Sequence, residues 1–549
     1  RGGGQPREWY RGIPVPSDMP ANFTRRNNTN YMQTAVLSAL QLTSMFPNLI
    51  VENFYVKTRN SMTAGLDAAP HAYVIPVQRD MTKPAELVRI LKVQGIEVGR
   101  LTAPATVGDD TYPAGSFIIK AGQPYWRLAK NLLEKQDYPD PALRTYDDSG
   151  WSMGHAFNVE VTEIADRSIL DAPVTLVQTV QLAGTTHDWV GTCDGPVHSV
   201  VLHYGSNHMV TLRYRTRHVP MRVTRESFTT AGHDVPAGSL VIGRVIGSAR
   251  SSTVEALDQQ HADVTRIARE LGLDTARICG EPTVPTHDAD VPRIAVYSNW
   301  SGTQELGWYR HAFDQFEIPY ELIYKERVAA GHLERDFDVI VMAMQNVSRS
   351  QVMAPPAAQP SPYQRSEKYR FLGMYGETAD TSGGFGEAGA RAIEQFLEAG
   401  RTLITTGQAV RFPIEFGLAR SVDTESVQGL NAQKPLVQAE IVKTTHPVFY
   451  GYEQAIIPVK FGQNQSVFRV GVADEANVLI RYVGGQDSVL SGLAEGADTL
   501  RGRAFAIDIP EAFRGRGRVL MFAGNPVYRW QNHGEFNMVF NAIVNWNDR

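Results

Sequence analysis

The chain has 549 residues, which is too long for a single hydrophobic core, so we expect several domains. Its 43% hydrophobic and 20% charged residues are ordinary for a globular protein, and a net charge of -5 gives no reason to expect a nucleic acid or an anionic membrane as partner. No apolar run approaches the roughly 18 residues that a spanning helix needs, so we predict no membrane span.

The two cysteines, Cys193 and Cys279, lie far apart in the sequence. Neither belongs to a motif that supplies a second metal ligand. We therefore expect neither a disulfide framework nor a cysteine-rich metal site. So few cysteines are compatible with an exported protein as well as with a cytosolic one.

The first region, residues 1–69, is predicted to be an irregular loop followed by two helices. Glycine and proline dominate the opening segment. Apolar residues then recur at helical spacings over residues 30–65, and Pro47 marks a break between two helices. Because the sequence opens with Arg1 and a loop, this region is typical of the inside of a longer polypeptide.

The next region, residues 70–285, is predicted to contain two related α/β units. The stretches "HAYVIPV", "TKPAELVRILKVQG" and "IEVGRL" indicate strand, helix and strand, which is a βαβ unit. Residues 96–119 align without a gap with residues 219–242, and both share Pro-Ala-Gly-Ser followed by apolar residues. Because Pro-Ala-Gly favours a turn, the same hairpin is predicted twice. Chance reuse of a common turn is the alternative to duplication.

The last region, residues 292–549, follows a linker rich in proline and aspartate, "EPTVPTHDADVP". Its pattern begins with "RIAVYSNW" as a strand and "TQELGWYRHAFDQFE" as a helix, and continues with "YELIYK", "FDVIVMAMQ" and "EAGARAIEQFLEAGRTLITTG". This alternation predicts a doubly wound, mostly parallel, flavodoxin-like sheet. Its ligand site is expected at the carboxyl ends of the strands.

Candidate site residues lie in two places in this last region. His533 and Glu535 form a His-x-Glu pair before a helix, which resembles the pair that activates the cysteine of class I glutamine amidotransferases. The turn after "RTLITT", where that cysteine would stand, contains Thr406 and Gly407 instead. Thr406 is thus the remaining candidate nucleophile of a degenerate triad. We expect His533 and Glu535 to be structural, with Asn532 capping the helix in a capping-box-like spacing.

Long stretches of the sequence resemble one family. "VPRIAVYSNWSGTQELGWYRHAFDQFEIPYELI", "FLGMYGE", "THPVFYGY" and "PVYRWQNHGEFNMVFNA" are similar to the amidotransferase-like domain at the C-terminus of large bacterial zinc carboxypeptidases. "REWYRGIPVP", "VENFYVKTRNSM" and "AYVIPVQRDMTKPAELVRILKVQGIEV" resemble the segment that follows their peptidase domain. The resemblance implies that residues 1–69 are the tail of a peptidase domain. It also implies an upstream peptidase domain or fragment as partner, a peptide substrate and a periplasmic or extracellular location, and it leaves a homo-oligomer open.

The family's zinc site was sought residue by residue. Such peptidases bind the metal through a His-x-x-Glu pair and a later histidine. None of the 14 histidines of this chain has a glutamate three places later. We therefore expect no cofactor in this chain and zinc in the upstream peptidase domain. The expected function is that of a non-catalytic C-terminal portion of a zinc carboxypeptidase-like protein. The alternative is a binding or assembly protein that reuses the amidotransferase-like fold.

Overall fold

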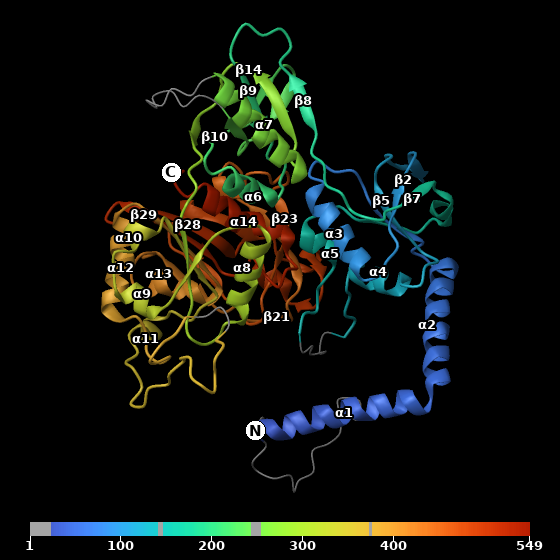
Figure 1. The fold of residues 1–549 in the computed structure, drawn as a ribbon, viewed down its shortest axis with the longest axis horizontal. Helices are drawn as coiled ribbons and strands as arrows, with labels where there is room; N and C mark the ends of the chain where they lie inside the picture. The colour runs from blue at the N-terminus through green and yellow to red at the C-terminus, as the bar shows by residue number, and fades with distance from the viewer. Residues whose placement is uncertain (1–23, 141–146, 243–253, 373–375, 549) are drawn as a thin grey trace.

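The computed structural model describes residues 24–140, 147–242, 254–372 and 376–548, and shows a multi-domain α/β protein with several sheets (Figure 1). One unit with a five-stranded sheet lies at the right of Figure 1 and a second unit lies at the top. The C-terminal part, coloured yellow to red, contains the largest sheet. The opening loop predicted before residue 24 lies outside the described residues.

Two long helices, α1 (Arg25–Met45) and α2 (Pro47–Asp67), form an arm, as the apolar spacing and Pro47 predicted. Proline is tolerated here because the first residue of a helix needs no backbone N–H donor. The two helices meet at 93°. No single described helix is long and apolar enough to cross a membrane, although this bent pair passes that test when it is taken together.

The first unit is a five-stranded sheet in the order β6-β1-β5-β2-β7. The predicted βαβ unit is wrong in one respect, because β5 lies between β1 and β2 and runs antiparallel to both. The antiparallel hairpin of β3 and β4 connects β2 to β5, and β5 is inserted between β1 and β2, which gives a split βαβ arrangement. The elements of this unit are β1 (Ala72–Ile75), α3 (Thr82–Val93), β2 (Gly99–Leu101), β3 (Ala105–Val107), β4 (Asp110–Tyr112), β5 (Phe117–Lys120), α4 (Trp126–Leu133), α5 (Met153–Phe157), β6 (Thr162–Ile164) and β7 (Val174–Leu176).

The second unit repeats this topology, and the hairpin that was predicted twice is present twice. Its sheet has the order β15-β10-β13-β9-β14-β8, so five of its strands match the five of the first unit one by one. β15 was not expected, because it lies within the predicted linker and pairs with β10. The elements are β8 (Thr186–Trp189), β9 (Val197–Val201), α6 (His208–Arg215), β10 (Met221–Thr224), β11 (Phe228–Thr230), β12 (His233–Val235), β13 (Leu240–Ile242), α7 (Val254–Glu270), β14 (Thr275–Cys279) and β15 (Thr286–Asp288).

A disulfide bond joins Cys193 to Cys279 in the second unit. This corrects the expectation from sequence spacing, which treated the two cysteines as unrelated. β14 pairs antiparallel with β9, and this pairing brings Cys279 opposite Val197, close to the loop that holds Cys193. The proximity is therefore a product of sheet pairing, which sequence separation does not reveal.

The C-terminal part is built on a twelve-stranded sheet. Its first five strands, β17-β16-β18-β19-β29, are parallel, as predicted. The rest of the main strand path, β28-β25-β22-β23, is antiparallel and was not predicted. The elements are β16 (Ile294–Tyr297), α8 (Gln304–Gln315), β17 (Glu321–Ile323), α9 (Lys325–Ala329), α10 (Leu333–Asp336), β18 (Val339–Ala343), α11 (Arg349–Val352), α12 (Gly386–Glu398), β19 (Thr402–Thr406), η3 (Gly407–Val410), α13 (Arg411–Glu415), β20 (Val422–Glu425), β22 (Leu436–Ile441), β23 (Ile456–Lys460), β24 (Val467–Val470), β25 (Val478–Tyr482), β28 (Ala504–Phe513), β29 (Arg516–Phe522) and α14 (His533–Val544).

Helix α14 connects the three parts of the fold. Every residue from its start at His533 to its end at Val544 is buried. It contacts α5 of the first unit, α6 of the second unit and β23 of the C-terminal sheet. A helix buried on every side lies at the centre of a large protein, and the two asparagines of α14, Asn537 and Asn541, are accommodated there because they donate hydrogen bonds to backbone carbonyls. The candidate residues at the start of α14 are therefore placed at a junction between parts of the molecule.

Candidate functional site

The turn after β19 is the place where an amidotransferase-like site needs its nucleophile. β19 ends at Thr406 and η3 begins at Gly407, so the predicted turn at Gly407 is confirmed. Gly407 has a φ of +55°, which is the left-handed conformation of a tight strand-to-helix turn. A Cβ atom at this position would overlap the sulfur of Met344. The position with nucleophile-like geometry thus has no side chain, and Met344 occupies the space.

Thr406 is held by a tyrosine instead of a base. It is fully buried at the end of β19, and its hydroxyl accepts a hydrogen bond of 3.2 Å from the hydroxyl of Tyr309. Burial raises the pKa of Tyr309 above its ordinary value, so this phenol remains protonated at neutral pH. A neutral phenol donates a hydrogen bond here and is too weak a base to remove the proton of the Thr406 hydroxyl. The contact therefore does not activate Thr406 for attack.

Glu535 lies in the first turn of α14 and is buried. One of its carboxylate oxygens, Oε1, accepts hydrogen bonds from the backbone N–H of Lys460 (2.9 Å) and from the side-chain amide of Asn532 (2.5 Å). Burial raises the pKa of Glu535 to about 8. The predicted cap is wrong, because the Asn532 side chain makes no hydrogen bond to the helix backbone. Asn532 is fully buried and donates its amide hydrogen to Glu535.

His533 faces the first unit. Its ring stacks on Phe157 of α5 with 4.3 Å between the ring centroids, and the ring of Trp530 packs edge-on against it at 4.6 Å. Burial lowers the pKa of His533 to about 3, so the ring is neutral at physiological pH. Among the described hydrogen bonds, none joins His533 to Thr406. The carboxyl group of Glu535, in contrast, helps to raise the pKa of Tyr309, the partner of Thr406.

A cavity of about 470 Å³ lies at the carboxyl ends of β18, β19 and β29. Gly407 lines it on one side, and Lys460, Asn525 and Arg529 contribute polar groups. Carboxyl ends of parallel strands are where open α/β sheets bind ligands. These three polar residues were not predicted from the sequence, although Asn525 and Arg529 follow β29 closely and their place after a strand was a usable signal.

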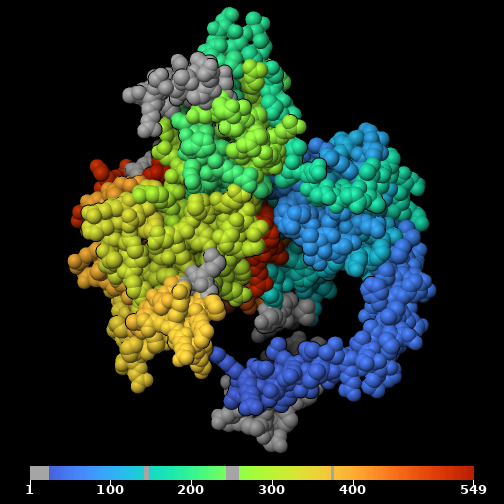
Figure 2. Space-filling model, viewed as in Figure 1, coloured from blue at the N-terminus to red at the C-terminus, as the bar shows by residue number. Residues whose placement is uncertain are grey.

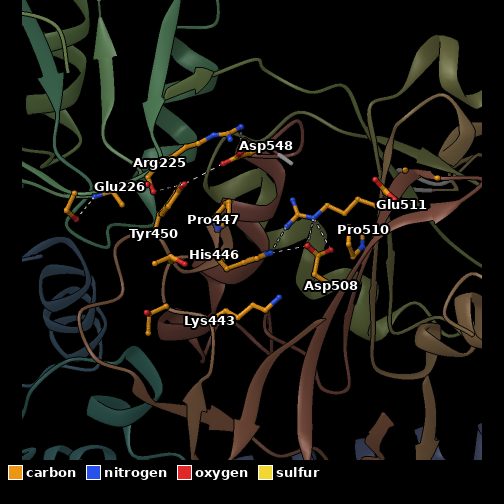
Figure 3. A pocket seen from close by; sticks show the side chains of 17 residues that line it. Arg225, Glu226, Lys443, His446, Pro447, Tyr450, Asp508, Pro510, Glu511 and Asp548 are labelled. Carbon is orange, nitrogen blue, oxygen red and sulfur yellow. Dashed lines mark hydrogen bonds and ion pairs between the residues drawn. The ribbon is translucent and has the colours of Figure 1, made fainter. Parts of the chain in front are cut away.

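A larger cavity of about 920 Å³ lies near the start of β29, between the C-terminal sheet and the second unit (Figure 3). Three side chains form its floor: the ring of His446 contacts Asp508 at 3.0 Å, and Arg518 contacts both oxygens of Asp508 at 2.9 and 3.0 Å. Arg518 and His446 outweigh the effect of burial and lower the pKa of Asp508 to about 2. Because both carboxylate oxygens are engaged, the trio is a structural ion pair that joins β28 and β29 to the His446 turn.

Within the described ranges, no group of three or more histidine, cysteine, aspartate or glutamate side chains is arranged to hold a metal ion.

No family model matches the chain, and no curated protein matches it. Solved structures that are similar include a cytoplasmic protein from Salmonella typhimurium (13% identity, TM-score 0.28, covering 46% of this chain and 98% of that one). They also include PurLQS from Thermotoga maritima (19%, 0.28, 47% and 100%) and a ThuA-like protein from Bacteroides uniformis (12%, 0.26, 48% and 95%). At TM-scores this low, the similarity identifies neither a family nor an activity.

Proposed function

We propose that this chain is the non-catalytic C-terminal portion of a zinc carboxypeptidase-like protein, and that its arm docks on the peptidase domain. The family resemblance of the sequence supports the identity of the partner and a peptide as substrate. The disulfide bond supports a periplasmic or extracellular location, because disulfides persist in oxidising compartments.

The C-terminal part is proposed to be a doubly wound, amidotransferase-like domain with a degenerate triad. The order β17-β16-β18-β19-β29 of its parallel strands supports this assignment, because it corresponds to the order 2-1-3-4-5 of flavodoxin-like sheets. The absence of a side chain at Gly407 and the stacking of His533 on Phe157 support the loss of catalysis. In such a domain the fold acts as a binding module.

The exposed apolar surface of the arm is the observation that carries the docking proposal. Met32, Val36 and Leu40 follow one stripe of α1 and are 69%, 59% and 61% exposed. On α2, Phe54 is 64% exposed, and the buried residues of the arm are confined to the end of α2. Figure 2 shows the arm, in blue, leaving the first unit at the right and bending below the rest of the molecule. Helices with this much exposed apolar surface are typical of an interface.

The docking proposal is tested by introducing charged residues into the apolar stripe of α1. The double variant Val36→Glu/Leu40→Glu should weaken binding of the upstream peptidase domain at least about 100-fold, because each buried aliphatic side chain contributes about 1.5–3 kcal/mol. Binding is measured by titration, and hydrogen exchange should show that the peptidase domain protects the backbone amides of α1 and α2.

The matched control is Ser38→Glu/Gln41→Glu, which adds the same charge to the opposite face of α1. Its affinity for the peptidase domain should stay within about twofold of that of the unmodified chain, a difference of well under 1.4 kcal/mol. An arm that is not protected by the peptidase domain would contradict the docking proposal. The docking proposal would also be contradicted if the backbone amides of the arm were protected from exchange only by lipid vesicles or only by a second copy of this chain.

A further inference from the structure

The cavity at the carboxyl ends of β18, β19 and β29 contains a buried donor without a protein partner. Asn525 lines the cavity and is 7% exposed. Its carbonyl oxygen accepts a hydrogen bond of 3.1 Å from the N–H of Val527, whereas its amide nitrogen has no partner among the described residues. An unsatisfied buried polar group costs about 1–3 kcal/mol. An acceptor atom supplied by a ligand would recover this free energy.

Four cationic side chains line the same cavity; Arg411 pairs with Glu415 at 2.9 Å, and the other three come from separate segments of the chain. Lys434 precedes β22, Lys460 ends β23 and Arg529 follows β29. Lys460 is only 2% exposed, and its ammonium group donates a hydrogen bond of 2.6 Å to the carbonyl oxygen of Gly150. Burial lowers its pKa to about 8, so it is still largely charged at neutral pH. Glu305 is the single acidic side chain in the described lining of the cavity.

Two consecutive carboxylates from the first part of the chain partly neutralise these cations. Asp147, which lies 287 positions before Lys434, contacts Lys434 and Arg529 at 2.8 Å. Asp148 accepts a hydrogen bond of 2.7 Å from Tyr528 and lies 3.6 Å from Lys460. Hydrogen bonds from Arg529 and Lys434 hold the pKa of Asp147 well below its usual range. The cluster is thus already built to bind carboxylate groups.

The segment that carries these carboxylates is fixed in place. The backbone N–H of Ser149 donates to the carbonyl of Gln433 (3.0 Å), and that of Gly150 donates to the carbonyl of Lys434 (3.4 Å). The hydroxyl of Ser149 accepts a hydrogen bond from the N–H of Leu493. Asp147 and Asp148 are therefore positioned counter-ions that share the cations with whatever enters the cavity.

We propose that this cavity binds a ligand through a carboxylate group, with Asn525 and Lys460 as its donors. Asp148 then acts as an internal competitor for Lys460. The indole of Trp308 and the ring of Tyr528 pack edge-to-face at 4.8 Å in the cavity wall, and they would contact the apolar part of the ligand. The inference goes beyond the proposed function, because it depends on neither the arm nor the peptidase domain.

The test measures binding of two carboxylates to the full chain by titration calorimetry. Succinate represents a free small acid, and the tripeptide Gly-Ala-Phe represents a peptide C-terminus. The variant Asp148→Asn should bind at least one of the two probes about tenfold more tightly, because it removes the competing charge. The variant Asn525→Leu should bind the same probe about tenfold more weakly, as expected for a lost hydrogen bond to a charged group. Asp188→Asn is the matched control, since it removes an exposed aspartate that pairs with Arg277 in the second unit, and it should leave binding unchanged.

The amidated tripeptide distinguishes recognition of a carboxylate from general affinity for a peptide. Stronger binding of the free tripeptide than of its amide supports a peptide C-terminus as the ligand, and binding of succinate alone supports a small acid. If Asp148→Asn does not fold, Asp147→Asn, which removes the carboxylate that contacts Lys434 and Arg529, should tighten binding in its place. The proposal is overturned if neither probe binds the full chain or its folded variants. Two further results would overturn it. One is that only the tripeptide binds and its amide binds equally tightly. The other is that Asn525→Leu binds the probe as tightly as the unmodified chain does.

Discussion

Replacing Arg518 by leucine should lower the free energy of unfolding by about 3–5 kcal/mol, because it leaves the buried charge of Asp508 without its main partner. The side chain of Arg518 is 6% exposed and that of Asp508 is 12% exposed, so the pair meets water only on the side that lines the cavity. Chemical denaturation of the two proteins measures the difference. Arg469→Leu is the matched control: Arg469 pairs with Asp423 at 2.6 Å, but both side chains are more than half exposed. Its loss should cost less than about 1 kcal/mol.

The same ion pair predicts how stability depends on pH. The pKa of Asp508 is about 2 in the folded protein, below the value of about 3.9 expected in the unfolded chain. A depressed pKa stabilises the fold above the unfolded pKa, and this contribution is lost as the pH falls from about 4 towards 2. The loss should be much smaller in Arg518→Leu than in the unmodified chain. Equal acid sensitivity of the two proteins would show that the pair does not contribute as described.

Removing the disulfide should cost the second unit about 2–4 kcal/mol. Cys193 and Cys279 are separated by 86 positions, and a cross-link that closes so long a loop restricts the unfolded chain strongly. Denaturant unfolding with and without a reductant measures the effect. The variant Cys193→Ala/Cys279→Ala should resemble the reduced protein and should not respond to the reductant. An unmodified chain whose stability is the same in both conditions would contradict this expectation.

Much of the local structure could be predicted from the sequence, because local signals specify it. Pro47 separates the two arm helices, and apolar periods identify α3 and α8. The alternation of strands and helices predicted β16, β17, β18 and β19 of the parallel part of the large sheet, whereas β29, its fifth parallel strand, was not predicted. Such patterns report the environment of one segment at a time.

Pairing between distant segments could not be predicted in the same way. The strands between β20 and β28 are short and have no long helices between them, so their antiparallel addition to the sheet left no periodic signal. The insertion of β5 between β1 and β2 and the disulfide partner of Cys279 likewise depend on tertiary pairing. These features arise from contacts whose partners are remote in sequence.

The candidate site also combines features that the local sequence predicts with features that depend on contacts between distant segments. The turn at Gly407 could be predicted from "RTLITTG", because a glycine after an apolar strand marks a turn. The contact of Asp148 with Tyr528 joins residues 380 positions apart, and neither residue belongs to a motif. The capping role expected of Asn532 failed for a related reason, since burial of Glu535 beside it created a demand for hydrogen-bond donors that spacing does not reveal.

Glutamine hydrolysis by the purified chain tests most directly the proposal that its C-terminal part is a non-catalytic, amidotransferase-like domain. Ammonia release is measured with the unmodified chain and with His533→Ala, alongside a buffer blank. We expect both proteins to match the blank, because Gly407 offers no nucleophile, Thr406 is bonded to a protonated tyrosine and His533 is stacked on Phe157. Hydrolysis above the blank that is abolished by His533→Ala would contradict the account and identify an active enzyme.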